Sequence, residues 1–236
     1  NDLTGRNKLR RIYLDHNATT PVHPEVYEAM LPFLKDEFGN PSSIHWAGRA
    51  PKKAIDEARE RAAQLLNCES SEVIFTGSGS EGNNFAIKGI VESKRDKGNH
   101  IITTKVEHPA VLNTCKYLAK TGFDVTFLDV DSDGMIDIEQ LKKAITPKTI
   151  LITIMFANNE TGVVFPIEEI GRIAKERNII FHTDAVQAAG KIPIDIKKLN
   201  VDILTISGHK LYAPKGVGAV YLKRGVRLVL LIHGGH

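Results

Sequence analysis

Short apolar runs rich in β-branched residues alternate along this chain with longer segments of helical periodicity. Such runs are typical of buried strands, and the segments between them are typical of amphipathic helices. The alternation predicts a three-layer α/β fold, in which a mixed, mostly parallel sheet carries helices on both faces. Strands are expected at Ile12–Asp15, Val73–Thr76, Ile101–Thr104, Asp124–Leu128, Ile150–Phe156, Ile179–Thr183, Val201–Ile206 and Gly218–Leu222. Helices are expected at Pro24–Phe38, Ala50–Leu66, Glu81–Lys94, Pro109–Lys120, Asp137–Ile145 and Pro166–Arg177.

The length and composition suit one large domain. The chain has 236 residues, of which 42% are hydrophobic and 25% charged, and these are ordinary globular values. We expect an N-terminal segment at residues 1–15 and a single large domain at residues 16–236. Only the strands Val201–Ile206 and Gly218–Leu222 are close enough in sequence to suggest an antiparallel pair.

Several function classes are disfavoured by composition. The formal charge is only +3, and the basic residues are interspersed, so nucleic-acid binding gains little support. No stretch approaches the ~18 apolar residues of a membrane span, and residues 1–11 lack the apolar core of a signal peptide. Cys68 and Cys115 form no disulfide framework and no zinc-ligand spacing. These features predict a soluble cytoplasmic protein without a metal site.

The segment Ser207–Lys210 follows the buried strand Val201–Ile206 directly. In open α/β sheets, ligands bind where strands end. A lysine held there is partly desolvated, which lowers its pKa and frees its amine to attack a carbonyl. Lys210 is therefore a candidate catalytic residue, although an ordinary surface lysine is the alternative.

A glycine- and serine-rich turn, TGSGSEGNN at residues 76–84, joins a strand to a helix. Free N–H groups at such a helix start favour an anion, most simply a phosphate. Ser78 and Glu81 also fit a capping box. The glycine spacing also matches a dinucleotide-binding turn. Such a turn is normally followed about 20 positions later by an acidic residue, and the nearest candidate here is Glu107, which fits that position poorly.

Other strand ends carry polar side chains. His108 lies just past Ile101–Thr104, Asn158 and Asn159 follow Ile150–Phe156, and Asp184 follows Ile179–Thr183. His108 is either a structural histidine or a group that stacks on a flat ring and transfers protons. Asp184 is either a helix cap or a partner for a cationic ring nitrogen.

Taken together, the polar residues at these strand ends point to one cofactor more specifically than any of them does alone. An anion site, a ring-stacking group, an acid for a pyridine nitrogen and a lysine for an aldehyde are what pyridoxal phosphate requires. A nicotinamide cofactor needs no lysine. The sequence therefore predicts pyridoxal phosphate as the cofactor.

With these residues, the chain resembles the cysteine desulfurases of the NifS/IscS type, within the class V aminotransferase group of fold-type I pyridoxal-phosphate enzymes. The resemblance covers nearly the whole chain, and its motifs occur in family order. They are YLDHNATTP at 13–21, FGNPSS at 38–43, residues 74–84, VEHPAV at 106–111, NNETGV at 158–163, HTDAVQ at 182–187 and residues 207–216.

The resemblance implies a role for each candidate residue. Lys210 would bind the cofactor aldehyde covalently, and Asp184 would pair with the ring nitrogen. His108 would stack on the ring and assist proton transfer. The remaining residues fall into two groups: Gln187 and Asn159 near the phenolic oxygen, and Gly79, Ser80, Ser207 and His209 around the phosphate.

The resemblance also implies the reaction and the partners. Sulfur would leave L-cysteine as an enzyme persulfide and pass to an iron–sulfur scaffold or another acceptor, with L-alanine as the product and a homodimer as the working form. A selenocysteine lyase or another class V enzyme is the first alternative. A cofactor-binding fragment, or half of a split enzyme that is inactive alone, is the second.

Three features of this family are not found in the 236 residues. The family's nucleophilic cysteine, its substrate-carboxylate arginine and its small C-terminal domain have no counterpart here. Residues 16–236 would be the large cofactor-binding domain, and its first helices are expected to pack with that small domain. Cys68 and Cys115 lie in no matching motif, so we interpret both as structural.

Overall fold

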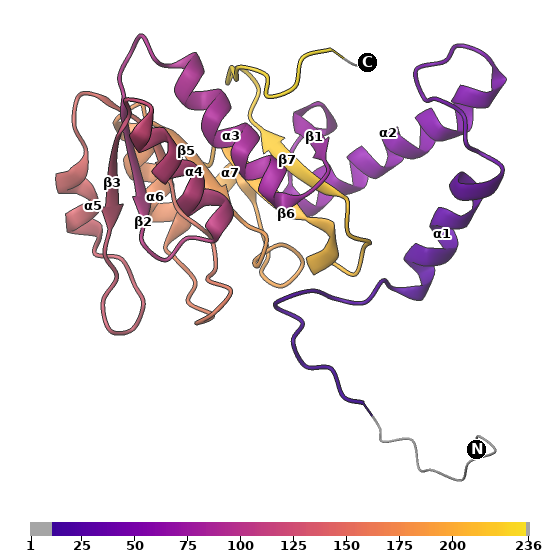
Figure 1. Ribbon diagram of the computed structural model, residues 1–236, viewed down its shortest axis with the longest axis horizontal. Helices are drawn as coiled ribbons and strands as arrows, with labels where there is room; N and C mark the ends of the chain where they lie inside the picture. The colour runs from indigo at the N-terminus through magenta and orange to yellow at the C-terminus, as the bar shows by residue number, and fades with distance from the viewer. Residues whose placement is uncertain (1–10, 235–236) are drawn as a thin grey trace.

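The computed structural model describes residues 11–234, which form a seven-stranded sheet flanked by helices (Figure 1). The strands are β1 (Val73–Thr76), β2 (His100–Thr104), β3 (Asp124–Leu128), β4 (Thr149–Thr153), β5 (Ile180–Asp184), β6 (Ile203–Ser207) and β7 (Gly218–Leu222). The helices are α1 (Pro24–Lys35), α2 (Trp46–Leu66), α3 (Gly79–Ser93), α4 (Pro109–Lys120), α5 (Ile138–Ala144), α6 (Ile167–Glu176) and α7 (Ile196–Leu199). The predicted α/β fold is confirmed.

The strand order is β1-β7-β6-β5-β4-β2-β3. Strands β2 to β6 pair in parallel, whereas β7 runs antiparallel to both of its neighbours. The expected pairing of β6 with β7 is confirmed, and the pairing of β1 with β7 was not anticipated. Because β1 and β6 both oppose β7, β1 points the same way as the parallel strands. The carboxyl ends of β1, β2, β4, β5 and β6 therefore share one edge.

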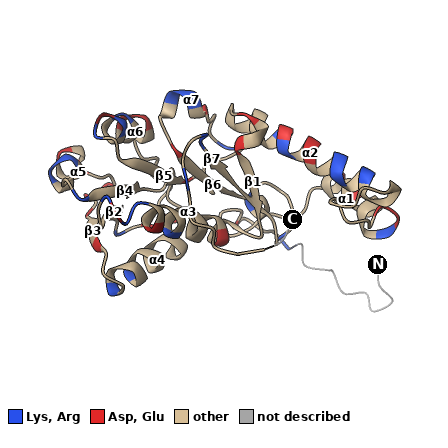
Figure 2. Ribbon diagram, turned by 90° about the horizontal axis from the view of Figure 1, so that it is seen from above, with Lys and Arg blue, Asp and Glu red and all other residues tan. Residues whose placement is uncertain are grey.

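Each face of the sheet has its own apolar core. On one face, Ile87 and Ile90 of α3 are fully buried with Ile101 and Leu151 of the sheet. On the other face, α6 packs with the C-terminal end of α2 over a second set of strand residues, and Figure 2 shows the two helix layers on opposite sides. Strands β2, β4 and β6 are buried along their whole length, as expected for strands covered on both sides.

Helix α1 and the first half of α2 extend away from the sheet (Figure 1). Helix α1 has no buried residue, while the far end of α2 buries Ala63 and Leu66. Large apolar side chains are consequently exposed along this arm: Tyr27, Phe33, Leu34, Phe38, Ile44 and Trp46.

The predicted strand Ile12–Asp15 is wrong. Residues 12–15 are exposed and form no ladder, because a strand needs a neighbouring edge to pair its N–H and C=O groups. Tyr13 instead donates its hydroxyl to the carbonyls of Asp15 and Thr19, at 2.7 and 3.0 Å. Residues 1–10 of the predicted N-terminal segment lie outside the described residues.

The N-cap residue makes one helix begin earlier than predicted. Helix α3 begins at Gly79 rather than Glu81, because Ser78 supplies its N-cap. The short helix α7 was not expected from the sequence. Within residues 11–234, no helix combines the length and apolar character that crossing a membrane requires.

Candidate active site

A cavity of about 470 Å³ opens at the shared edge where β1, β2, β4, β5 and β6 end. It brings together every site residue predicted from the sequence: Gly79, Ser80, His108, Asn159, Asp184, Gln187, Ser207, His209 and Lys210. A shallower depression of about 550 Å³ beside α6 contains none of them. The residues predicted at the strand ends therefore lie around one cavity.

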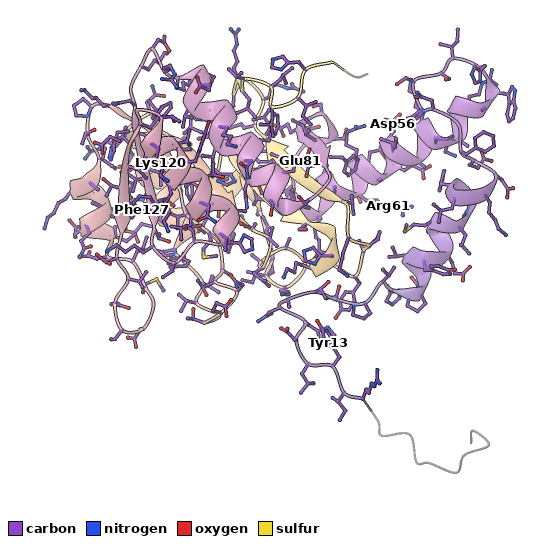
Figure 3. All side chains as sticks on the ribbon, in the orientation of Figure 1. Tyr13, Asp56, Arg61, Glu81, Lys120 and Phe127 are labelled. Atoms are coloured by element: carbon purple, nitrogen blue, oxygen red, sulfur yellow. The ribbon has the colours of Figure 1, made fainter. Side chains whose placement is uncertain are left out.

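The first turn of α3 forms one wall of the cavity. Ser78 Oγ accepts a hydrogen bond from Glu81 N at 3.0 Å. The predicted capping box is only half formed, because the Glu81 carboxylate accepts from Gly77 N at 2.8 Å rather than from Ser78 N. Figure 3 labels Glu81 at this helix start. The N–H groups of Gly79 and Ser80 have no carbonyl partner within the helix, so they are available to an anion.

Gly79 is required where it stands. A Cβ atom there would lie 2.9 Å from Val186 Cγ2 and 3.2 Å from Ser207 Cβ. Glycine therefore lets the helix start approach the ends of β5 and β6 closely, with buried Ser207 beside it. This arrangement leaves room for an anion between backbone N–H groups and a hydroxyl.

Asp184 ends β5 and is 5% exposed. Its Oδ1 accepts from Val186 N at 3.0 Å, and its Oδ2 accepts from Asn83 Nδ2 at 2.6 Å. Burial raises the pKa of Asp184, while these two hydrogen bonds act in the opposite direction. A carboxylate that faces a cavity with uncharged donors behind it favours a cationic group in front.

His108 caps α4, since its Nδ1 accepts from Ala110 N at 3.1 Å, and its ring also lines the cavity. The structural and functional interpretations of this residue are therefore compatible. Glu107, in contrast, is buried: its Oε1 accepts from Thr104 Oγ1 at 2.9 Å and from Met155 N at 3.0 Å. Glu107 is thus not available to a ribose hydroxyl, which disfavours a dinucleotide.

Lys210 follows β6 in a short 3-10 turn. Burial lowers the pKa of Lys210, and the charge of Lys191 lowers it further. Its Nζ donates to the carbonyls of Asn17 and of Ala18, the latter at 2.6 Å. The carboxylates of Asp15 and Asp184 act in the opposite direction, and the net effect is a lowered pKa for the Lys210 amine.

Residues 15–23, here called the latch segment, close one side of the cavity. Thr20 N donates to His209 O at 2.9 Å, and His23 N donates to Tyr212 O at 2.9 Å. His209 Nδ1 lies 3.1 Å from Thr19 Oγ1. Burial lowers the pKa of His209, and the nearby Lys210 adds to this effect. The latch segment is therefore fixed to the lysine turn by backbone and side-chain contacts.

Two amides complete the lining. Gln187 Nε2 donates to Asn17 O at 2.8 Å, and its Oε1 accepts from Lys191 Nζ at 2.9 Å. Asn159 Nδ2 donates to Glu160 Oε1 at 2.6 Å at the exposed rim. Because an ammonium only donates, Lys191 fixes which way the Gln187 amide points.

Residues 12–236 match the protein family described as aminotransferase class-V. The chain belongs to the aminotransferase class-V family.

This class-V chain is similar to proteins named cysteine desulfurase IscS. It is 54% identical over 226 residues to the one from Clostridium botulinum and 56% identical over 226 residues to the one from Dictyoglomus turgidum. Each comparison covers 96% of this chain and 57% of the relative. The chain therefore spans little more than half the length of these relatives.

Solved structures agree with the sequence relatives. A NifS-like protein matches with a TM-score of 0.93 and 43% identity, over 96% of this chain and 62% of that one. SspA in complex with cysteine matches with a TM-score of 0.92 and 47% identity, over 94% and 65% of the two chains.

Several lining residues of this class-V site were missed from sequence. Asn83, Met155 and Glu160 line the cavity, as do Asn17 and Ala18 of the latch segment. A signal for Asn83 existed, because it lies four positions after Gly79 and so on the same face of α3. Within residues 11–234, no three His, Cys, Asp or Glu side chains are grouped so as to hold a metal ion.

Proposed function

We propose that this chain binds pyridoxal phosphate in the cavity and acts as the cofactor-binding part of a cysteine desulfurase. The observation that carries the proposal is one cavity lined by a helix start, a buried carboxylate and a lysine of lowered pKa. The names of the relatives and the cysteine bound to SspA support L-cysteine as the substrate.

The lining residues fit the cofactor. The N–H groups of Gly79 and Ser80, with Ser207 and His209 beside them, suit a phosphate. The Asp184 carboxylate, whose donors behind it are uncharged, suits a protonated ring nitrogen. Lys210 suits the aldehyde, and His108 offers a flat ring. We assign Gln187 and Asn159 to the phenolic oxygen.

The chain's own residues would perform the proton chemistry. Bound pyridoxal phosphate supplies an electron sink for the pair left when a substrate Cα proton is removed. Lys210 Nζ would take that proton, because its lowered pKa increases the neutral amine near neutral pH. His108 would move a second proton at the substrate. Asp184 would hold the ring nitrogen in its charged form.

Neither cysteine of this chain suits the sulfur-transfer step. Cys115 is buried, and burial raises the pKa of its thiol to about 12. Cys68 is half-buried, and burial together with Glu72 raises its pKa to about 11. Near neutral pH, thiols of such high pKa hold almost no thiolate, which is the nucleophilic form. We therefore propose that a cysteine outside these 236 residues receives the sulfur and passes it to an iron–sulfur scaffold or another acceptor.

The exposed arm of α1 and α2 supports a larger assembly. We propose that its apolar side chains, Phe33, Leu34 and Trp46 among them, pack against a small C-terminal domain. The matched relatives are long enough to contain such a domain beyond the matched region. We also propose that the working form is a homodimer. Free Cys68 and Cys115 support a reducing, cytoplasmic setting.

Absorbance of the purified chain tests cofactor binding. Added pyridoxal phosphate is expected to give a visible absorbance band, and borohydride reduction should remove that band and leave the cofactor covalently attached to Lys210. Lys210→Ala should abolish the band, while Lys198→Ala, an exposed lysine on α7, should retain it. A colourless wild type under saturating cofactor contradicts the proposal.

An assay with cysteine as substrate tests the proposed sulfur acceptor separately from cofactor binding. With cysteine, we expect no persulfide on Cys68 or Cys115 of this chain alone. A sulfide- or alanine-producing reaction that requires either thiol would overturn the assignment of the sulfur acceptor.

A further inference from the structure

Asn83 and Asp184 form a buried pair between α3 and β5. Asn83 is 1% exposed and Asp184 is 5% exposed, and Asn83 Nδ2 donates to Asp184 Oδ2 at 2.6 Å. The contact spans 101 positions in sequence, so tertiary packing creates it. Both residues line the cavity, and no sequence argument had singled out Asn83.

Close packing of α3 on the sheet places the amide there. A Cβ atom on Gly82, the preceding residue, would lie 2.8 Å from Thr205 Cγ2 and 2.9 Å from Val220 Cγ2. Only a residue without a side chain allows α3 to lie this close to β6 and β7. The approach brings Asn83 within hydrogen-bond distance of the end of β5.

The orientation of the Asn83 amide is set by the carboxylate. An ionised carboxylate only accepts hydrogen bonds, so the NH₂ group must face Asp184. Asn83 Oδ1 then has no hydrogen-bond partner among the described residues, although it is buried. Leaving a buried acceptor unpaired costs free energy.

We propose that Asn83 is a positioning residue that holds the Asp184 carboxylate charged and aimed into the cavity, opposite the ring nitrogen of the cofactor. This inference rests on the proposed function, since the ring nitrogen belongs to the proposed ligand. Asn83 acts through Asp184 and need not touch substrate. As a neutral donor, it keeps this effect whatever the protonation state of its neighbours.

The charged groups around Asp184 lie at the start of α4 and in the turn after β6. His108 at the start of α4 and Lys210 after β6 favour its ionised form, whereas burial opposes it. Glu107, just before α4, is a second buried carboxyl whose charge would also oppose ionisation of Asp184. Of the two direct hydrogen bonds, the one from Val186 N comes from the backbone, so Asn83 supplies the only one that a substitution removes cleanly.

A carboxyl titration of the cofactor-free 236-residue chain tests this directly. Carbon-13 NMR should place the Asp184 midpoint about one to two pH units higher in Asn83→Leu than in wild type. The matched control is Asn84→Leu, whose wild-type amide bonds Ser80 O and Thr114 Oγ1 instead. An unchanged Asp184 midpoint in Asn83→Leu overturns the proposal. Asn83→Ala provides the same reading if the leucine variant does not fold.

A ligand comparison adds the link to the ring nitrogen. Asn83→Leu should weaken pyridoxal phosphate binding about 10-fold or more, for a shift of one pKa unit or more. It should leave unchanged the binding of an analogue with carbon in place of that nitrogen. Equal weakening of both ligands contradicts the proposal. A wild type that binds neither ligand refutes the proposed function, while the NMR titration still decides the role of Asn83.

Discussion

The buried carboxyl of Glu107 offers a sharp test of the electrostatics beneath the cavity. Burial raises the pKa of Glu107 from 4.5 to about 8, partly offset by its hydrogen bonds from Met155 N and Thr104. The native state therefore keeps this proton over a pH range in which the unfolded chain has lost it. Because the native state binds more protons, its stability falls as pH rises, until Glu107 itself ionises near pH 8.

Glu107→Gln mimics the protonated carboxyl, since its amide oxygen retains the acceptor for Thr104 and Met155 N. The free energy of unfolding of this variant should lack the pH dependence that Glu107 gives to wild type. Between pH 6.5 and 9, wild type is expected to lose about 2 kcal/mol relative to the variant, from 1.36 kcal/mol for each pH unit below the native pKa. Histidines also titrate near pH 6.5, but they are common to wild type and variant, so their contribution cancels in the difference between the two proteins.

Urea unfolding at several pH values measures the difference. Glu168→Gln is the control, because Glu168 is exposed on α6 and should follow wild type throughout. If wild type and Glu107→Gln lose stability in parallel from pH 6.5 to 9, Glu107 is already ionised in the native state. The account of its burial given above would then be wrong.

Three further substitutions test other contacts. Lys191→Met should raise the pKa of Lys210, since removing a neighbouring positive charge favours the ammonium; a pH titration of cofactor binding measures this, and an unmoved midpoint contradicts it. Gly171→Ala should destabilise the fold by about 1–3 kcal/mol in urea unfolding, because its Cβ would lie 2.1 Å from Leu199 O; wild-type stability would disprove the tight α6–α7 contact. Burial lowers the pKa of His182 to about 3, so stability should fall as pH drops from 6.5 toward 3, and His182→Asn should flatten that decline; an unaltered acid slope would show that His182 is not its source.

The sheet was predictable because its central strands are buried on both faces. Runs such as Ile101–Thr104 and Val201–Ile206 are short and rich in β-branched residues, and strands buried in the interior show that composition. Polar residues placed directly after these runs could then be assigned to one edge. Strand direction indicated the edge of the sheet where these residues lie, and the family resemblance supplied the remaining candidates and their expected roles.

What failed depended on contacts distant in sequence. Ile12–Asp15 has the composition of a strand, but it pairs with no strand of the sheet. The pairing of β1 with β7 joins Val73 to Tyr221, and local periodicity carries no information about such partners. Asn83 was missed because an amide inside a helix resembles an ordinary helix residue until the opposing carboxylate is known.

The latch segment also affects when the cavity can exist during synthesis. The hydrogen bond from Thr20 Oγ1 to His209 O joins positions 189 residues apart. At ~5–20 residues per second, the ribosome needs about 10–40 s to make the second partner after the first. Throughout that interval residues 15–23 have no binding partner in the lysine turn, and the cavity lacks a wall. Cofactor capture should therefore be a late event in biogenesis, and cofactor binding by nascent chains would report that the last strands have joined the sheet.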